Sequence, residues 1–127
     1  MSSKDFYSTP IVPTGAMTGT ATIYSQAFDI RFQVGCSFAV KWTGTPTGTL
    51  SVQVSNDYVP NLQNATTPIN AGTWYPIQAS ITTQPAGEPG QIYIPVYGIV
   101  SSYIQLVYVN SSGTGVLSGQ FTCKTWG

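Results

Sequence analysis

The chain has very few charged side chains and no histidine. Four Lys or Arg and four Asp or Glu make up 6% of its 127 residues, whereas an average globular protein has about 25%. Without histidine, Ser-His-Asp and Cys-His catalytic arrangements cannot form, and zinc sites built on histidine are excluded. The net charge of zero removes the electrostatic attraction by which proteins bind nucleic acid or anionic membranes. A surface so poor in charge suits a subunit of a larger assembly, because such proteins tend to associate.

The few carboxylates are scattered along the chain. Asp5 lies near the N-terminus, Asp29 is two residues from Arg31, Asp57 is in a polar turn, and Glu88 is in a Gly/Pro-rich segment. A glycosidase needs two convergent carboxylates, one with a raised pKa, and this distribution does not favour such a pair. Asp57 could bind calcium, but calcium takes six to eight oxygen ligands, so turn formation is the favoured interpretation. We expect a protein that is not an enzyme, with no catalytic residue, cofactor or metal.

The chain has two cysteines, Cys36 and Cys123, and two states are open to them. A disulfide would close a loop of roughly 88 residues and contribute about 4–5 kcal/mol in the chain-entropy model. The alternative is a pair of buried thiols that pack as small hydrophobic side chains. The N-terminus has no basic segment followed by an apolar run, so we expect no signal peptide, synthesis in a cytoplasm and thiols. No apolar run approaches the length of a membrane-spanning helix, and no membrane association is expected.

Alternation of apolar and polar side chains is the dominant pattern, and no helical periodicity of useful length occurs. Hydrophobic residues make up 42% of the chain, with 13 Gly and 9 Pro between the patterned segments. The strands that this pattern predicts are residues 19–25, 28–34, 36–42, 50–54, 74–81, 92–100, 103–109 and 116–124. We therefore expect an all-β fold: an antiparallel β-sandwich or jelly roll of about eight strands.

Two Gly-rich turns each connect a pair of these strands. Residues 43–48 separate strands 36–42 and 50–54, and residues 110–115 separate strands 103–109 and 116–124. Two patterned strands around a short Gly-rich segment are typical of a β-hairpin, so the pattern predicts two hairpins. Strand 103–109 is apolar on both faces and is expected at the centre of a sheet.

The chain divides into an N-terminal arm, residues 1–18, and a single β-sandwich domain, residues 19–127. Pro10 and Pro13 are expected to prevent regular ladder pairing in the arm, which we expect to pack on this domain or on a neighbouring subunit. Residues 56–73 form a long polar connection, and long loops in compact domains are usually functional or interfacial. The candidate interface residues in the arm and this loop are Tyr7, Ile11, Val12, Tyr58 and Val59.

One stretch resembles a known family. Residues 40–57, VKWTGTPTGTLSVQVSND, have the form W-x-G-T-x-x-G-x-hydrophobic-x-V-x-x-S-N-D and are followed by Trp74, YIQLVY at 103–108 and SGTGVL at 112–117. This order is similar to that of small β-sandwich structural proteins of tailed bacteriophages and related viruses, over residues 20–124. The resemblance implies a virion component, such as a capsid decoration, minor capsid or tail-associated protein. Its partners would be other virion proteins and copies of itself, and the resemblance brings no catalytic residues.

Structural roles are expected for the marked residues of these patterns, namely Trp42, Gly44, Gly48 and Trp74, together with Cys36 and Cys123. The aromatic side chains leave an alternative function open. Trp42, Trp74 and several tyrosines could stack on sugar rings, as in a glycan- or receptor-binding module of a spike or fibre. Packing in the core or at an interface is the favoured interpretation, because large aromatics dominate both. The glycan alternative requires Trp or Tyr side chains exposed together on one face.

Overall fold

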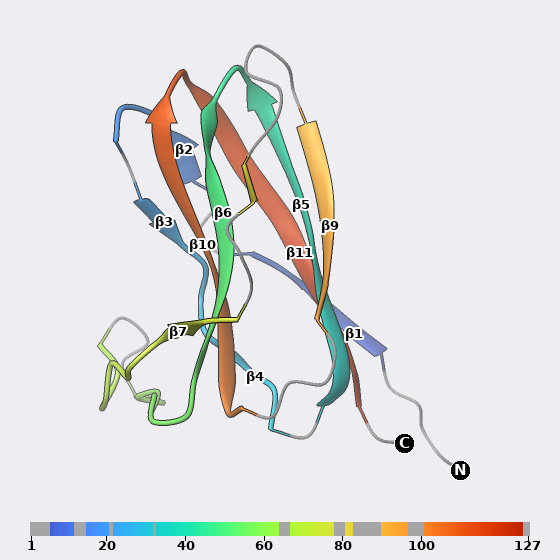
Figure 1. Cartoon of the computed structure of the whole chain (residues 1–127). Coiled ribbons are helices and arrows are strands. Elements are labelled where there is room, and N and C mark those ends of the chain that lie inside the picture. The colour runs from blue at the N-terminus through green and yellow to red at the C-terminus, as the bar shows by residue number, and fades with distance from the viewer. Residues whose placement is uncertain are drawn as a thin grey trace.

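The computed structural model is built of strands that form two sheets facing each other (Figure 1). It describes residues 6–11, 15–20, 22–31, 33–63, 67–77, 81–82, 90–96 and 101–125. All regular elements in these ranges are strands, so they contain no helix that could cross a membrane. Every strand pairing is antiparallel. The predicted all-β antiparallel sandwich is confirmed.

One sheet has five strands in the order β1-β11-β5-β9, with β2 also paired to β11. Their bounds are β1 Phe6–Pro10, β2 Gly15–Met17, β5 Gln33–Gly44, β9 Gly90–Val96 and β11 Gly115–Thr125. The other sheet has six strands in the order β3-β10-β6-β7, with β4 paired to β10 and β8 to β6. Their bounds are β3 Thr22–Tyr24, β4 Phe28–Asp29, β6 Thr47–Ser55, β7 Tyr75–Pro76, β8 Ile81–Thr82 and β10 Tyr103–Ser112.

The core lies between the two sheets, where alternate side chains of each strand meet. Phe38 on β5 and Phe121 on β11 are fully buried, and Phe28 on β4 stacks on Phe121 at 4.1 Å between ring centroids. The six-stranded sheet contributes fully buried side chains such as Leu50 and Ile104. Each such side chain stabilises the fold by about 1.5–3 kcal/mol through its removal from water. The period-two pattern of the sequence therefore corresponds to one inward face per sheet.

Strand β10 is central, as its sequence predicts, and from Tyr103 to Tyr108 it is buried on both faces. It pairs with β6 along one edge and with β3 and β4 along the other. Its inward side chains, including Leu106 and Tyr108, belong to the core. On the opposite face, Tyr103, Gln105 and Val107 are also buried, which requires something to cover that side of the sheet.

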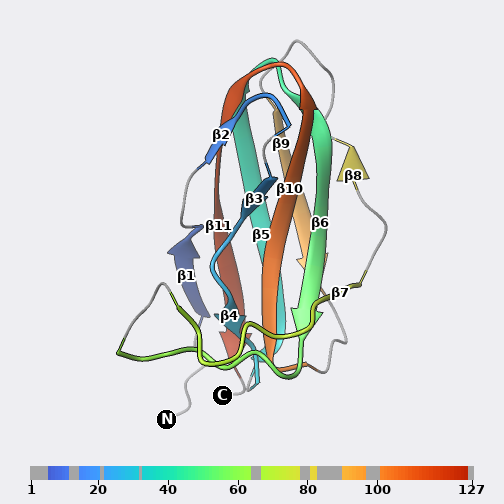
Figure 2. The ribbon, with the colours of Figure 1, turned by 90° about the vertical axis from the view of Figure 1, so that its left-hand side faces the viewer.

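The two predicted hairpins are wrong, although their strands and turns exist. Strands β5 and β6 lie in different sheets, and so do β10 and β11. Each Gly-rich turn is thus an arch that carries the chain from one sheet to the other, and both arches lie at the same end of the sandwich (Figure 2). A strand with one apolar face shows the same alternation in a hairpin and in an arch. The pattern therefore identifies the strands but not their pairing partners.

The two arches pack directly against each other, and glycines make this possible. Gly44 pairs with Gly115, and the amide of Thr45 donates to the carbonyl of Thr114 at 2.8 Å. Gly44 has a φ of 80°, a conformation that favours glycine. A Cβ at Gly44 would meet the Thr114 carbonyl. A Cβ at Gly48 would meet the carbonyl of Val109 and the ring of Tyr108, both on β10. These two marked glycines of the sequence pattern act in packing the arches.

Part of the expected N-terminal arm belongs to the five-stranded sheet. Residues 6–10 and 15–17 pair with β11, and the amide of Ile11 donates to the carbonyl of Gly119 at 2.9 Å. The expectation that prolines prevent pairing here is wrong for Pro10, while Pro13 lies outside the described residues. Strand β1 is an edge strand, and an edge strand tolerates proline because one of its sides needs no ladder partner.

Two further strand predictions differ from the structure. The predicted strand 28–34 is divided into β4, in the six-stranded sheet, and β5, which begins at Gln33 in the other sheet. Arg31 lies in the turn between them, and its backbone amide donates to the Asp29 carboxylate at 3.0 Å. Of the predicted strand 74–81, the described residues contain only the short β7 and the first residue of β8.

Candidate functional site

The outer face of the five-stranded sheet is a broad surface with very little charge. Its outward side chains form cross-strand rows, Ser8–Thr122–Ser37–Pro95, Pro10–Gln120–Ala39–Tyr93 and Ser118–Lys41–Gln91. Lys41 and Lys124 are the only charged side chains among its described residues. We call this surface the outer face. It offers neutral hydrogen-bonding groups and apolar contacts to a partner.

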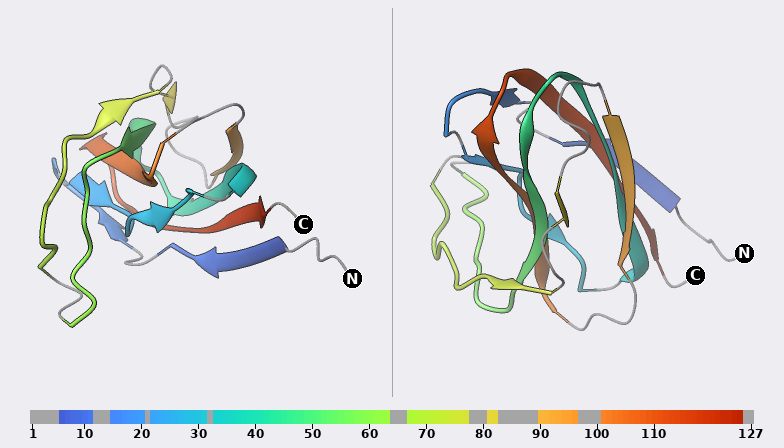
Figure 3. Two further views of the ribbon diagram at one scale, coloured as in Figure 1. Left: turned by 90° about the horizontal axis from the view of Figure 1, so that it is seen from below. Right: turned by 45° about the horizontal axis from the view of Figure 1, so that its top comes forward.

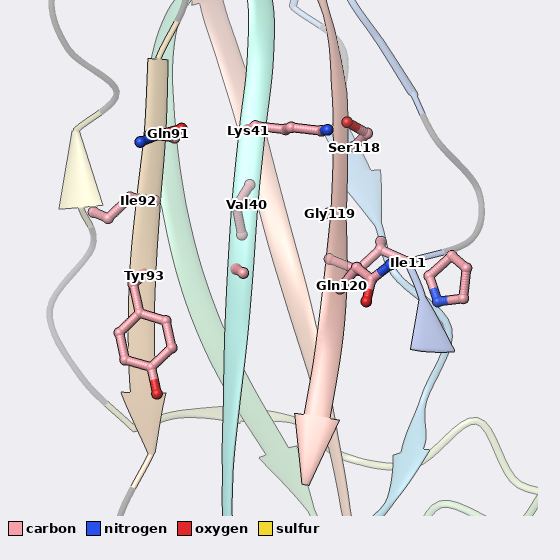
Figure 4. A pocket seen from close by; sticks show the side chains of 11 residues that line it. Ile11, Val40, Lys41, Gln91, Ile92, Tyr93, Ser118, Gly119 and Gln120 are labelled. Carbon is pink, nitrogen blue, oxygen red and sulfur yellow. The ribbon is translucent and has the colours of Figure 1, made fainter. Parts of the chain in front are cut away.

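A shallow pocket of about 820 Å³ lies on the outer face (Figure 4). It extends across the four strands from Pro10 at the β1 side to Tyr93 on β9, with Ala39 and Gly119 between them. The small side chains in the middle rows leave this depression, while Tyr93, which is 63% exposed, stands at its side. The described residues that line the pocket include one cationic group, Lys41, and no carboxylate.

On the opposite side of the molecule, residues 56–63 and 67–74 run over the outward side of the six-stranded sheet (Figures 2 and 3). We call this segment the cover loop. Its two ends are held together through Asp57, whose Oδ1 accepts from the amide of Thr73 at 2.7 Å and from the Ser55 hydroxyl at 2.9 Å. These two hydrogen bonds lower the pKa of Asp57 below its usual value, the Thr73 amide having the larger effect. Asp57 thus closes the loop through a residue 16 positions later, whereas the turn interpretation expected its side chain to bond to nearby backbone. The local turn is formed by Ser55, whose hydroxyl accepts from the amides of Asp57 and Tyr58 at 3.3 and 3.2 Å.

Two further contacts fix the cover loop. Val59 and Asn70 form a bridge of two backbone hydrogen bonds, of 2.9 and 3.1 Å. The side-chain oxygen of Asn56 accepts from the Ser101 hydroxyl at 2.9 Å and from the amide of Ser102 at 3.3 Å. The loop is therefore anchored both to itself and to the segment before β10.

An aromatic cluster packs beneath the cover loop. The ring of Tyr58 lies 5.0 Å from that of Tyr103 and 5.6 Å from that of Trp74, between centroids. The indole Nε1 of Trp74 donates to the carbonyl of Ala71 at 2.9 Å, and the Arg31 guanidinium lies 5.7 Å from the centre of the Tyr103 ring. These contacts bury the outward side of β10 and hold the two loop aromatics in place.

A groove of about 820 Å³ lies between the cover loop and the segment from β3 to β4. Its lining comprises Tyr24, Ser25, Gln26, Ala27, Tyr58, Pro60, Asn61, Leu62, Pro68, Ala71, Trp74 and Gln105. We call it the aromatic groove. None of these side chains is charged. Ligand sites in proteins typically have volumes of about 300–1,000 Å³ and combine apolar walls with a few polar groups.

The charged side chains near this end of the molecule neutralise each other. Arg31 donates to both oxygens of Asp29, at 3.0 and 2.6 Å, as the sequence spacing suggests. The hydrogen bond from Arg31 lowers the pKa of Asp29 and raises that of Arg31. The pair is exposed to solvent, which screens the attraction, so it adds little to the stability of the fold. Among the described residues, no three of Cys, Asp and Glu come together as a metal site would require.

The two cysteines lie directly opposite each other on β5 and β11. Cys36 pairs with Cys123 in the antiparallel register, and both are present as thiols. Burial, with a smaller effect from Cys123, raises the pKa of Cys36 to about 12. A thiol with so high a pKa is a poor nucleophile at neutral pH, because the thiolate is the reactive form. Both cysteines therefore serve here as packing side chains.

The predicted structural and interface residues occupy different environments. Trp42 is 4% exposed, and its Nε1 has no hydrogen-bond partner among the described residues; it is part of the core and offers no sugar-stacking surface. Trp74 is half-buried beside Tyr58, and Val59 is exposed on the cover loop. Ile11 is 1% exposed and packs in the protein's own core, and it also lines the pocket on the outer face; its place at an interface stays a prediction. The Tyr7 side chain and Val12 lie outside the described residues.

Sequence reasoning missed the exposed Tyr24, whereas it included Tyr93 among the tyrosines that could stack on a sugar ring. Tyr24, on the short edge strand β3, is 55% exposed and lines the aromatic groove, while Tyr93 stands on the outer face. Each lies at an outward position of its strand, but alternation alone does not tell which of the two faces is outward at the ends of short strands.

Comparison of the chain with protein-family models, with curated proteins and with solved structures finds no match. What the fold establishes is the class, an all-β antiparallel sandwich, and function has to be argued from its two candidate surfaces.

Proposed function

We propose that the chain is a non-catalytic structural protein of a bacteriophage virion, acting as a capsid decoration, minor capsid or tail-associated component. It would assemble with copies of itself and with other virion proteins by surface complementarity. The observation that carries the proposal is the outer face, which spans four strands and has only two charged side chains among its described residues. Interface cores are depleted in charged residues in the same way.

The chemistry of the described residues supports a role without catalysis. Asp29 and Asp57 both have lowered pKa values, whereas a general acid at neutral pH needs a raised one. Cys36 has a raised pKa, which suppresses its thiolate. The residues of the phage-like pattern also have packing roles, since Gly44 and Gly48 lie at the arches and Trp42 is in the core.

Assembly through the outer face should depend weakly on salt. Screening acts on charges, and the outer face has few of them. The binding free energy would come from burial of Tyr93, Pro10 and the small side chains around Ala39, and from hydrogen bonds between neutral groups. Association with nucleic acid or membrane has no support in the charge distribution.

Size-exclusion chromatography with light scattering at about 0.05 and 0.5 M salt tests the proposal. We expect the same oligomer at both ionic strengths. Ala39→Arg, which places a large cation at the centre of the outer face, should shift the protein to monomer, whereas Thr20→Arg, at an exposed turn elsewhere, should not. A monomer at both salt concentrations would contradict self-assembly, and an unchanged Ala39→Arg oligomer would place the interface on another surface.

The location on a particle needs its own measurement. Mass spectrometry of purified virions of the encoding phage should detect the chain at a copy number that fits the symmetry of a capsid or tail. Its absence from washed particles would exclude a virion role, whatever the oligomeric state of the isolated protein.

A further inference from the structure

The aromatic groove has the construction of a small-molecule site. It is separate from the outer face, because its lining residues come from the cover loop, from the segment between β3 and β4 and from β10, which belongs to the other sheet. Tyr24 contributes from the β3 side, Tyr58 and Trp74 contribute from the two ends of the cover loop, and Gln105 contributes from β10. Segments far apart in the sequence thus meet around one cavity.

The groove is held in its shape before any ligand arrives. The Tyr58 ring packs against Trp74 and Tyr103, and the Trp74 indole is fixed by its hydrogen bond to Ala71. On the floor, the side-chain amide of Gln105 donates to the Oε1 of Gln53 at 3.0 Å. A preorganised site loses little conformational entropy on binding, so more of the contact energy appears as affinity.

The lining selects for a neutral ligand. All its residues are uncharged, and the nearby Asp29 and Arg31 satisfy each other in a two-point ion pair. A phosphate, carboxylate or ammonium group entering the groove would lose hydration without gaining an opposite charge, which is unfavourable. A ligand that fits must therefore be polar without being charged, or apolar.

The remaining groups match a sugar. The C–H groups on the flat side of a pyranose ring carry partial positive charge and stack on the negative face of an aromatic ring, for which Tyr24 and Trp74 are placed. The carboxamides of Asn61 and Gln105 can donate and accept hydrogen bonds beyond those they make within the protein. Neighbouring hydroxyls of a sugar need this combination of donors and acceptors.

We propose that the aromatic groove is a binding site for a neutral saccharide, with Tyr24 and Trp74 as stacking surfaces and Asn61 and Gln105 as hydroxyl-binding groups. The proposal goes beyond assembly: it gives the subunit a means to attach to uncharged carbohydrate on a cell surface. The outer face would remain free for other subunits, because the two surfaces lie on different sheets.

Saturation-transfer difference NMR and calorimetric titration of the whole chain would test the site. The probes are neutral sugars (glucose, galactose, mannose, N-acetylglucosamine and their disaccharides), with sialyllactose and a proline decamer as competing classes. We expect at least one neutral sugar to bind with a Kd of about 1 mM or lower, and sialyllactose to bind no better than the corresponding neutral disaccharide.

Matched variants place the binding on the molecule. Tyr24→Ala removes an exposed stacking ring and should weaken sugar binding at least about tenfold, whereas Tyr93→Ala removes an equally exposed ring from the outer face and should leave it unchanged. Trp74→Phe keeps an aromatic ring to pack against Tyr58. Sugar binding by this variant therefore separates an effect of the smaller stacking surface from an effect of unfolding. No binding by any neutral sugar, binding by the proline decamer alone, or loss of sugar binding in Tyr93→Ala and not in Tyr24→Ala would each overturn the proposal.

Discussion

On the six-stranded sheet, the outward side chains of β10 from Tyr103 to Val107 are buried, and Tyr103 packs against Tyr58 of the cover loop, whereas on the five-stranded sheet the outward side chains Ala39, Lys41 and Tyr93 are exposed. Tyr103 is 8% exposed and Tyr93 is 63% exposed, although both are outward tyrosines on regular strands. The chain thus covers part of the outward face of one sheet with its own loop and leaves the outward face of the other uncovered. A sandwich buries only the inward faces of its two sheets in the core. Whether the outward face of each sheet is covered or exposed therefore reflects function and local architecture.

The first prediction compares the core with the cover loop. Trp42→Ala should lower the free energy of unfolding by about 3–5 kcal/mol, because Trp42 is buried between the sheets. Trp74→Ala should lower it by about 1–2 kcal/mol, because Trp74 is half-buried and loses one ring contact and one hydrogen bond. Urea titrations at equilibrium measure both values. Equal losses of unfolding free energy in the two variants would show that the cover loop packs as tightly as the core.

The second prediction compares the outward faces of the two sheets, with one Tyr→Ala substitution on each. Tyr103→Ala removes a buried ring that contacts Tyr58 and Arg31 and should cost about 3 kcal/mol of unfolding free energy. Tyr93→Ala removes an exposed ring from the outer face and should change the stability of the monomer by less than about 0.5 kcal/mol. Thermal and urea unfolding at low protein concentration keep assembly out of the measurement. A large loss in Tyr93→Ala would mean that the outer face is packed within the chain itself.

The third prediction concerns the closure of the cover loop at low pH. The folded-state pKa of Asp57 is below its usual value, so its stabilising effect is complete above about pH 4 and is lost as the pH falls through the folded-state pKa. The amide proton of Thr73, which bonds to this carboxylate, should report the titration in NMR spectra with a midpoint below about 3.9. Asp57→Asn should abolish this titration, while Asp29→Asn should leave it in place. A midpoint at the usual value of an Asp side chain would show that the loop is open in solution.

The strands and their inward faces could be predicted because they depend on local alternation. Phe38, Val40 and Trp42 share one side of their strand in the sequence pattern, and all three are in the core. The two-sided apolar run at 103–109 likewise predicted a central strand, because only a strand covered on both sides can bury both faces. The turn at residues 55–58 followed from short-range side-chain chemistry, here of the Ser55 hydroxyl, but the bond between Asp57 and Thr73 joins residues 16 positions apart and was not predicted.

The candidate surfaces could be predicted only in part. The low charge was visible from composition, but the gathering of Tyr24, Tyr58 and Trp74 around one groove depends on β3 and the cover loop lying side by side. That Ile11 also fills the space left by Gly119 in the core was not predicted, because a Pro-containing segment gives no pairing signal. Contacts between segments about a hundred residues apart leave no local pattern in a single sequence.

By itself, the sequence determined the all-β class, the positions of most strands, the side of each strand that faces inward, and the shortage of charge. Only the tertiary structure decided that the Gly-rich turns at 43–48 and 110–115 cross between sheets as neighbouring arches, that β1 lies at a sheet edge, and that the outward face of one sheet is partly covered while that of the other is exposed. The physical reason is the distance along the chain over which each property is set. Side-chain alternation is set by backbone geometry within each strand. The choice of partner strand depends instead on how whole faces pack, and alternative partners could bury similar apolar surface.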